Sequence, residues 1–328
     1  MTDGYLYYQG NSIVGSGNVP VFFHTNSKAD IFVNQILNIG ANPAQPVIAF
    51  QNMSNQSNIN VTVYELISGN GLQGLVNVMG AGTTYNGNVR IVARKIFAPV
   101  GSILYFGAAT VANIADCSFT LICPEMIDNG VYNPPVYQAG IQIEGGLATN
   151  LAFKSNLRIE GNLITTSTGK RGFITFAINT NFYVDYIGTI TSASAAIQIT
   201  GGGSNYNFDG TFTGDNQLIG PPGPFAAVFL ENPGLGTSTY WITFNGFIHA
   251  LSLNQDVILL PDANPGPVLR FKVVQLKAED PAVFSVSSPI VTNTYKVVGV
   301  LASNVAQNNI SNEYLGITPD FVNPGIAR

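Results

Sequence analysis

The chain consists largely of short stretches in which hydrophobic and polar residues alternate, separated by Gly, Asn and Pro. Alternation with a period of two is typical of β-strands that bury one face, whereas helical periodicity is weak and limited to residues 28–36 and 304–315. The pattern therefore predicts an all-β fold. In the first part of the chain, strands are expected at residues 19–24, 31–39, 47–52, 59–67, 72–79, 88–97, 102–110 and 118–123.

A second series of strands follows an irregular stretch with Pro134-Pro135, and paired prolines cannot join the middle of a sheet. This series is expected at residues 140–144, 157–165, 173–179, 182–190, 196–200, 205–213, 225–230, 240–250, 256–260, 268–276, 283–286 and 295–301. We interpret residues 126–138 as a linker between two tandem jelly-roll β-sandwiches. The first covers residues 1–125 with a short N-terminal arm, and the second covers residues 139–328 with a C-terminal arm. Because the second series has more strands than one sandwich needs, an inserted β subdomain or long loops are expected at about 150–222.

Two distant stretches share one pattern, which supports a duplicated sandwich. Residues 90–106 and 241–260 each contain a long alternating strand, a short turn and a short apolar strand. The second stretch begins almost half a chain length after the first. Two sandwiches of the same type would account for both the chain length and the proline-rich stretch between them.

The composition points to a structural or surface-binding protein. The chain has 13 Lys and Arg and 18 Asp and Glu residues, so 9% of it is charged, against about 25% in a typical soluble domain. The net charge of −5 argues against electrostatic binding of nucleic acid, which needs clustered Lys and Arg. No secretory signal and no apolar run of membrane-spanning length is expected. A surface poor in charge can be buried against neighbouring subunits with little desolvation of ions.

Two consecutive jelly rolls in a charge-poor chain resemble the double jelly-roll major capsid proteins of tailless icosahedral bacteriophages and related viruses. The resemblance implies a structural virion protein that forms homotrimers and assembles into an icosahedral shell in the host cytoplasm. It also implies no enzymatic activity, no cofactor and no metal. Under this interpretation the aromatic segment Tyr5–Asn11 docks on a neighbouring subunit, another virion protein or an underlying layer.

A second interpretation is a trimeric receptor- or glycan-binding β-protein, such as a fibre tip or a β-helix adhesin, whose aromatic side chains stack on sugars. Glu160, Asp185 and Asp209 each follow an apolar residue, and they recur at nearly equal intervals along the chain. Such a recurrence is typical of rungs of a parallel β-helix, here from about residue 141 to 248, on which stacked acids can cleave polysaccharide. Alternatively, these acids face solvent on antiparallel hairpins.

Few residues offer catalytic or metal-binding chemistry. His24 and His249 lie in strand patterns, where a hydrogen-bonded structural histidine is expected, and neither a nucleophile-elbow motif nor zinc-ligand spacing accompanies them. On one strand, Cys117 and Cys123 would lie ~20 Å apart, beyond the about 7 Å between Cα atoms that a disulfide allows. Buried free thiols are therefore favoured over metal ligands or an intermolecular bridge.

Two basic sites and one glycine-rich segment complete the candidates. Lys170-Arg171 and Arg94-Lys95 are expected to be solvated charges on loops or strand edges, or to contact an acidic residue of a neighbouring subunit. Residues 200–204 lack the Lys-Ser/Thr of a phosphate-binding loop and are expected to form a turn. The sequence thus predicts no catalytic, cofactor or metal site.

Overall fold

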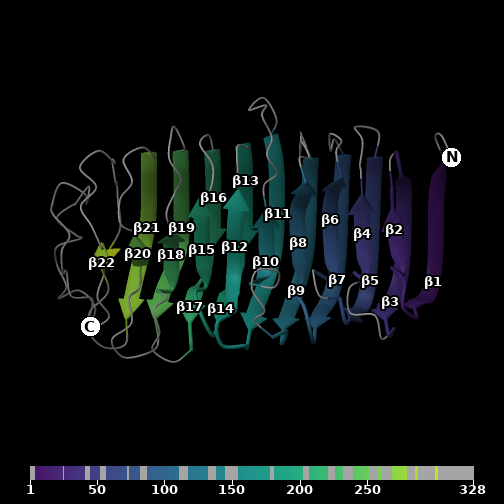
Figure 1. Ribbon diagram of the computed structural model, residues 1–328, viewed down its shortest axis with the longest axis horizontal. Coiled ribbons are helices and arrows are strands. Elements are labelled where there is room, and N and C mark those ends of the chain that lie inside the picture. The colour runs from purple at the N-terminus through teal and green to yellow at the C-terminus, as the bar shows by residue number, and fades with distance from the viewer. Residues whose placement is uncertain are drawn as a thin grey trace.

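The alternating stretches form strands that pair into two sheets, as a computed structural model of the chain shows (Figure 1). The structure describes residues 4–24, 26–40, 45–51, 57–71, 74–81, 87–110, 117–131, 138–144, 154–177, 181–201, 207–220, 226–231, 239–250, 258–260, 268–278, 285–286 and 300–301. Within this part of the chain, sheet A has 13 strands and sheet B has 10. No helix in it is long and apolar enough to cross a membrane.

Most strands of sheet A are long, and those of sheet B are shorter. Sheet A contains β1 (Tyr5–Gly15), β3 (Lys28–Asn38), β5 (Ser57–Gly69), β7 (Gly87–Ala98), β9 (Cys117–Asp128), β11 (Lys154–Thr165), β13 (Asn181–Ile187), β14 (Ile190–Ser192), β16 (Asn207–Thr213), β17 (Asn216–Leu218), β19 (Thr239–Ala250), β21 (Val268–Ala278) and β23 (Val300–Leu301). Sheet B contains β2 (Val21–Phe23), β4 (Ile48–Gln51), β6 (Val76–Ala81), β8 (Leu104–Thr110), β10 (Ala139–Glu144), β12 (Arg171–Ala177), β15 (Ile197–Gly201), β18 (Val228–Glu231), β20 (Ile258–Leu260) and β22 (Ser285–Val286).

The chain alternates between the two sheets and advances along one axis, so the protein is a parallel β-solenoid (Figure 1). Every strand pair that the structure describes is parallel. Jelly rolls are built from antiparallel strands, so the prediction of two tandem jelly-roll sandwiches is wrong. The β-helix alternative has the right architecture, and it extends well beyond residues 141–248.

Related expectations change with the topology. The described residues of the range 150–222 form no separate subdomain, because the strands from β11 to β17 belong to the same two sheets. Both sheets continue across the expected linker, where β9 pairs with β11 and β8 with β10; residues 132–137 lie outside the described part. Residues 28–36, where the helical periodicity is weak, form part of β3, which confirms the strand predicted at 31–39; residues 304–315 are not described.

The apparent duplication is the repeat of a single solenoid turn. Residues 90–106 fall on β7 and β8, and residues 241–260 fall on β19 and β20. Five successive strand pairings of sheet A separate β7 from β19, through β9, β11, β13 and β16. The capsid resemblance rested on duplicated jelly rolls, so this fold gives it no support. The expected homotrimer, virion location and lack of enzymatic activity stay predictions.

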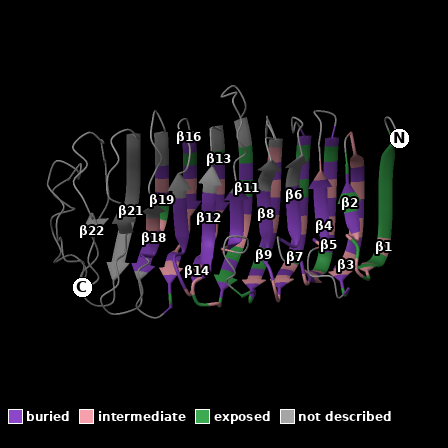
Figure 2. Cartoon of the chain, viewed as in Figure 1, coloured by how far each residue is buried: buried purple, intermediate pink, exposed green. Residues whose placement is uncertain are grey.

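The core consists of apolar side chains from both sheets, and the strands that carry its buried residues are purple in Figure 2. In the first half of β3, β5 and β7, each residue lies beside its counterpart one turn later, as Lys28 lies beside Asn58 and Asn58 beside Asn88. One inward column therefore contains Ala29, Ile59, Val89 and Phe119, all nearly fully buried. Burial of one such large apolar side chain contributes ~1.5–3 kcal/mol relative to exposure, so these columns are the main source of stability.

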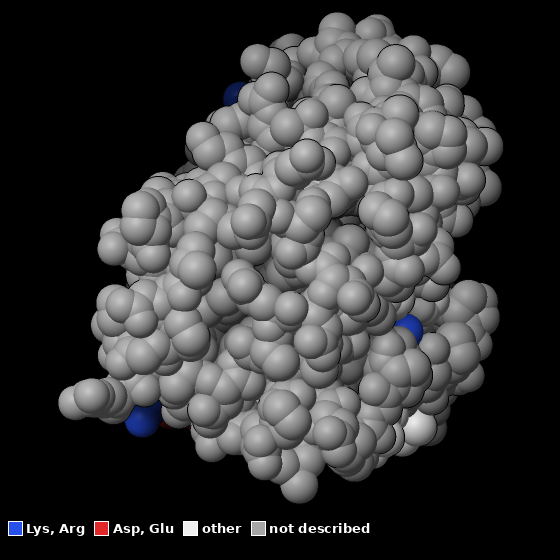
Figure 3. Space-filling model, turned by 90° about the vertical axis from the view of Figure 1, so that its left-hand side faces the viewer, with Lys and Arg blue, Asp and Glu red and all other residues white. Residues whose placement is uncertain are grey.

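The first strand, β1, lies at one end of the solenoid and is more exposed than the strands next to it. The segment expected to be a free arm lies in β1, which pairs in parallel with β3 and carries no buried residue (Figure 2). Tyr5 and Tyr7 are 61% and 59% exposed. The docking of segment Tyr5–Asn11 on another subunit stays a prediction. At the opposite end, a few Lys and Arg atoms are visible among the described residues (Figure 3).

From β11 to β17, sheet A contains a corner where glycines stack on one another. Gly161, Gly188 and Gly214 have φ angles of 138°, 140° and 123°, which favour glycine over any other residue. A Cβ on Gly188 would lie 2.0 Å from the carbonyl oxygen of Gly161, and a Cβ on Gly214 would lie 2.3 Å from that of Gly188. The backbones of successive turns therefore approach each other too closely for a side chain.

We expect Gly188→Ala to destabilise the solenoid strongly, because the new methyl group would meet the Gly161 carbonyl. Gly17→Ala is the matched control, since Gly17 has a φ of 124° but nothing within 4 Å of an added Cβ. Backbone strain alone costs about 1–3 kcal/mol. In urea-induced unfolding, Gly188→Ala should therefore lose at least ~2 kcal/mol more than Gly17→Ala. Equal losses would show that the stacked corner does not limit stability.

Candidate functional site

The outer face of sheet A carries ordered columns of side chains. Alternate residues of a strand point away from the core, and parallel pairing places each one beside its counterpart on the next strand, ~4.8 Å away. One outward column contains Asn88, Ser118, Asn156, Tyr183 and Asp209. The neighbouring column contains Arg90, Thr120, Arg158, Asp185 and Thr211. These two columns run side by side along the solenoid axis.

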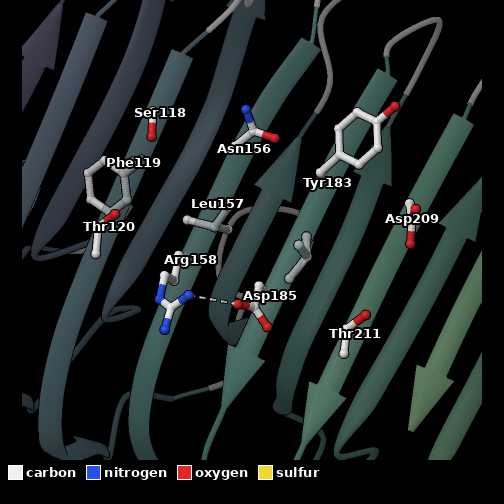
Figure 4. Close-up of a pocket in the computed structure, with 11 residues that line it drawn as sticks. Ser118, Phe119, Thr120, Asn156, Leu157, Arg158, Tyr183, Asp185, Asp209 and Thr211 are labelled. Carbon is white, nitrogen blue, oxygen red and sulfur yellow. Dashed lines mark hydrogen bonds and ion pairs between the residues drawn. The ribbon is translucent and has the colours of Figure 1, made fainter.

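A shallow groove of about 450 Å³ lies over these columns where β9, β11, β13 and β16 meet (Figure 4). Its outward side chains are Ser118, Thr120, Asn156, Arg158, Tyr183, Asp185, Asp209 and Thr211. Phe119, Leu157 and Val184 also border it, but their side chains are buried in the core. The floor is therefore strand backbone, and polar side chains from four strands form the walls.

The charges at the centre of the groove are held by ion pairs. The Arg158 guanidinium contacts Glu160 through Nε at 2.6 Å and Asp185 through Nη1 at 3.2 Å (Figure 4). The hydrogen bond from Arg158 to Glu160 and the nearby charge of Asp185 raise the pKa of Arg158 above its usual value. Arg158 itself is half-exposed, so the three groups form a positioned but solvated cluster with one more negative than positive charge.

Asp209 differs from the other acids because it has no hydrogen-bond or ion-pair partner among the described residues. Partial burial raises the pKa of its carboxyl group above the usual value. The strand register places Asp209 beside Tyr183 and, on the other side, beside Trp241. A ligand in the groove would therefore meet a carboxyl group to which none of the described residues donates a hydrogen bond.

Several neutral side chains of the groove likewise make no hydrogen bond to the described residues. The side chains of Ser118, Thr120, Asn156, Tyr183 and Thr211 make no hydrogen bond within the part of the chain that the structure describes. Hydroxyl and amide groups both donate and accept hydrogen bonds. The Tyr183 ring is 38% exposed, so one aromatic side chain is accessible beside these groups. The groove therefore combines a planar ring with neutral and acidic hydrogen-bonding groups on a rigid sheet.

A second groove, of about 650 Å³, lies further along the outer face of sheet A and is a weaker candidate. In this groove Gln35 donates to Glu65 at 2.9 Å, and Lys95 pairs with Glu125 at 2.5 Å. Its polar groups thus largely bind each other across neighbouring strands.

The structure tests the residues singled out in the sequence. Glu160, Asp185 and Asp209 lie on parallel strands, so their assignment to antiparallel hairpins is wrong. They do not stack, however: Asp185 pairs with Arg158 and Thr211, whereas Asp209 pairs with Tyr183. Position 158 lies beside position 185, and position 185 lies beside position 211. The number of residues between paired positions is therefore larger than the number between consecutive acids, so the acids fall out of line with one another.

The histidines and cysteines lie outside the groove. His24 is exposed after β2, and His249 is 8% exposed within β19. Cys123 is a buried free thiol, as expected, and burial raises its pKa to about 12. Cys117 lies on the same strand, β9, but its side chain is not described. The described residues contain no cluster of three or more His, Cys, Asp or Glu that could hold a metal ion.

The basic pairs behave differently from each other. Arg94 and Lys95 lie at the surface, as expected. Lys170 and Arg171 are buried, at 0% and 6% exposure, so their assignment as solvated charges is wrong. Residues 202–204 of the glycine-rich segment lie outside the described part.

Sequence reasoning missed Arg158 and Tyr183, although both lie at outward positions of alternating strands. Only the strand register reveals that they share a groove with Asp185 and Asp209. Comparisons with protein-family models, with curated proteins and with solved structures found no match for this chain. The function is therefore inferred from the groove itself.

We expect Arg158→Met to change stability by less than about 1 kcal/mol, because both of its ion pairs are solvated. Urea-induced unfolding at low and high salt would measure this. A loss above ~2 kcal/mol exceeds what exposed ion pairs normally contribute, and it would mean that the cluster supports the fold.

Proposed function

We propose that the protein is a β-solenoid binding module of the adhesin or fibre-tip type, which holds a glycan chain in the groove over β9, β11, β13 and β16. The observation that carries the proposal is the set of unpartnered polar groups around the exposed ring of Tyr183. Sugar hydroxyls donate and accept hydrogen bonds, as do the Ser, Thr and Asn side chains of the groove. An amphipathic Tyr ring can pack against the C–H face of a sugar while its hydroxyl stays solvated.

The scaffold suits recognition of a repeating polymer. Equivalent positions recur ~4.8 Å apart along the solenoid axis, so a chain molecule lying across the strands meets side chains at regular intervals. Each wall residue is fixed by a strand that is hydrogen-bonded on both sides. Such preorganisation lowers the entropy lost on binding.

The charges indicate which glycans fit. Glu160, Asp185 and Asp209 contribute three acidic groups at or beside the groove, against the single guanidinium of Arg158. Electrostatic complementarity therefore favours a neutral or amino-sugar chain over an acidic polysaccharide. The same excess of acids, with the net charge of −5, disfavours nucleic acid.

We expect Tyr183→Ala to weaken glycan binding about tenfold or more, because truncation of a stacked aromatic anchor costs ~1.4 kcal/mol or more. A glycan array of neutral, amino-sugar and acidic oligosaccharides would identify a bound probe, and titration calorimetry would measure its affinity. Tyr64→Ala is the matched control, since Tyr64 is 56% exposed on β5 and does not line the groove. Unchanged binding by Tyr183→Ala, or an equal loss in both variants, would refute the proposed site.

Asp209→Asn should shift the charge preference of the groove. Removal of one negative charge is expected to weaken binding of chitosan oligomers and to improve binding of oligogalacturonate, with neutral oligomers little affected. Glu65→Gln makes the same change of charge in the second groove and should have no such effect. If any oligomer were cleaved, and Asp209→Asn abolished the cleavage, the groove would be an active site and the binding-only proposal would fail.

A further inference from the structure

A fully buried ion pair joins two turns of the solenoid at the end of β9. Lys170 Nζ lies 2.6 Å from Asp128 Oδ1, and both side chains are 0% exposed. Lys170 Nζ also donates to the carbonyl oxygen of Gly101 at 2.7 Å. The backbone N–H of Gly130 donates to the same Asp128 Oδ1 at 2.8 Å. The amine and the carboxyl group are thus held in contact within the core.

The second carboxylate oxygen is an anomaly in this otherwise ordered site. Asp128 Oδ2 is buried without a hydrogen-bond partner among the described residues. It faces the backbone of Gly140, where an added Cβ would lie 3.3 Å from it. A buried ion pair is stabilising only if the remaining hydrogen-bonding groups are satisfied, and here one of them is not.

Burial acts against the charged form of each group, and the attraction between the two charges offsets only part of this effect. Burial raises the pKa of Asp128 to about 6 and lowers the pKa of Lys170 from its usual value. Transfer of one proton within the pair converts ammonium and carboxylate into amine and carboxylic acid. The neutral amine is a nucleophile, and the acid has a hydroxyl that can leave as water.

We propose that Lys170 and Asp128 become joined by an intramolecular amide bond between Nζ and the side-chain carboxyl carbon Cγ. Nζ attacks Cγ, Oδ1 becomes the amide oxygen, and Oδ2 leaves with two protons as one molecule of water. No oxidant or other reactant is needed. The Gly130 N–H already points at Oδ1, where negative charge develops during the attack. Fixed contact between the two groups replaces a bimolecular encounter.

Amide formation would remove each unfavourable feature of the site. Both buried charges disappear, and the oxygen without a partner leaves the core. The bond would close a loop between residues 42 positions apart and tie the end of β9 to the turn before β12. A cross-link of this kind restricts the unfolded chain as a disulfide does. The inference does not depend on the proposed glycan binding.

The test is the intact mass of the denatured full-length protein, measured by mass spectrometry. We expect a mass lower than that of the sequence by one water molecule, and a branched peptide that joins the segments around residues 128 and 170 after proteolysis. A mass equal to that of the sequence would overturn the proposal. Loss of water located elsewhere, such as a cyclised Asp209-Gly210, would overturn it equally.

A double variant, Asp128→Leu with Lys170→Met, provides the reference because it removes both charges together and leaves neither unpaired. Its mass should equal that of its sequence. An unlinked pair would also make wild-type stability fall as the pH rises from 3.8 to about 6, because folded Asp128 keeps a proton that the unfolded chain has lost. An amide does not titrate, so we expect the urea midpoints of both proteins to change in parallel over this range. A steeper loss in the wild type would contradict the bond.

Discussion

In-register parallel pairing is the constraint on which the rest of this structure depends. Each turn of the chain hydrogen-bonds to the next, so every residue lies beside its counterpart one turn away. Inward positions must therefore fit a continuous apolar column, such as Ile31, Val61, Ile91 and Leu121. The same rule makes a close approach at one corner recur at the next, which is why Gly161, Gly188 and Gly214 stack.

The rule also explains why so little of the chain is charged. Stacked positions lie ~4.8 Å apart, so a charge repeated from turn to turn would face its own kind along a whole column. In the strand pairs that the structure describes, no two like charges are direct neighbours. Lys95 instead pairs with Glu125, and Arg158 with Asp185. In-register stacking therefore disfavours repeated like charges, and a low charge content limits such repeats whether or not copies of the chain pack together.

Strand positions could be predicted from the sequence, and their arrangement could not. Alternation of apolar and polar residues is the same in parallel and antiparallel strands, so it located β3 and β7 but said nothing about their partners. The informative signal was the constant interval that relates positions 29, 59, 89 and 119. The similarity between residues 90–106 and 241–260 spans five solenoid turns and was mistaken for a duplicated domain. The buried Lys170 could not be predicted, because its partner Asp128 is 42 residues away and only the fold brings them together.

The groove lies where this repeat becomes irregular. The interval between paired positions is constant from Asn58 through Asn88 to Ser118, becomes longer from Ser118 to Asn156, and is then shorter on the way to Tyr183 and Asp209. Where the interval is constant, this outward column contains Lys28, Asn58, Asn88 and Ser118. Where the interval changes, the same column presents an amide, an aromatic ring and a carboxyl group in succession. Departures from local regularity are expected at functional or strained sites. The irregular turns therefore point to the same part of the solenoid as the chemistry of its side chains.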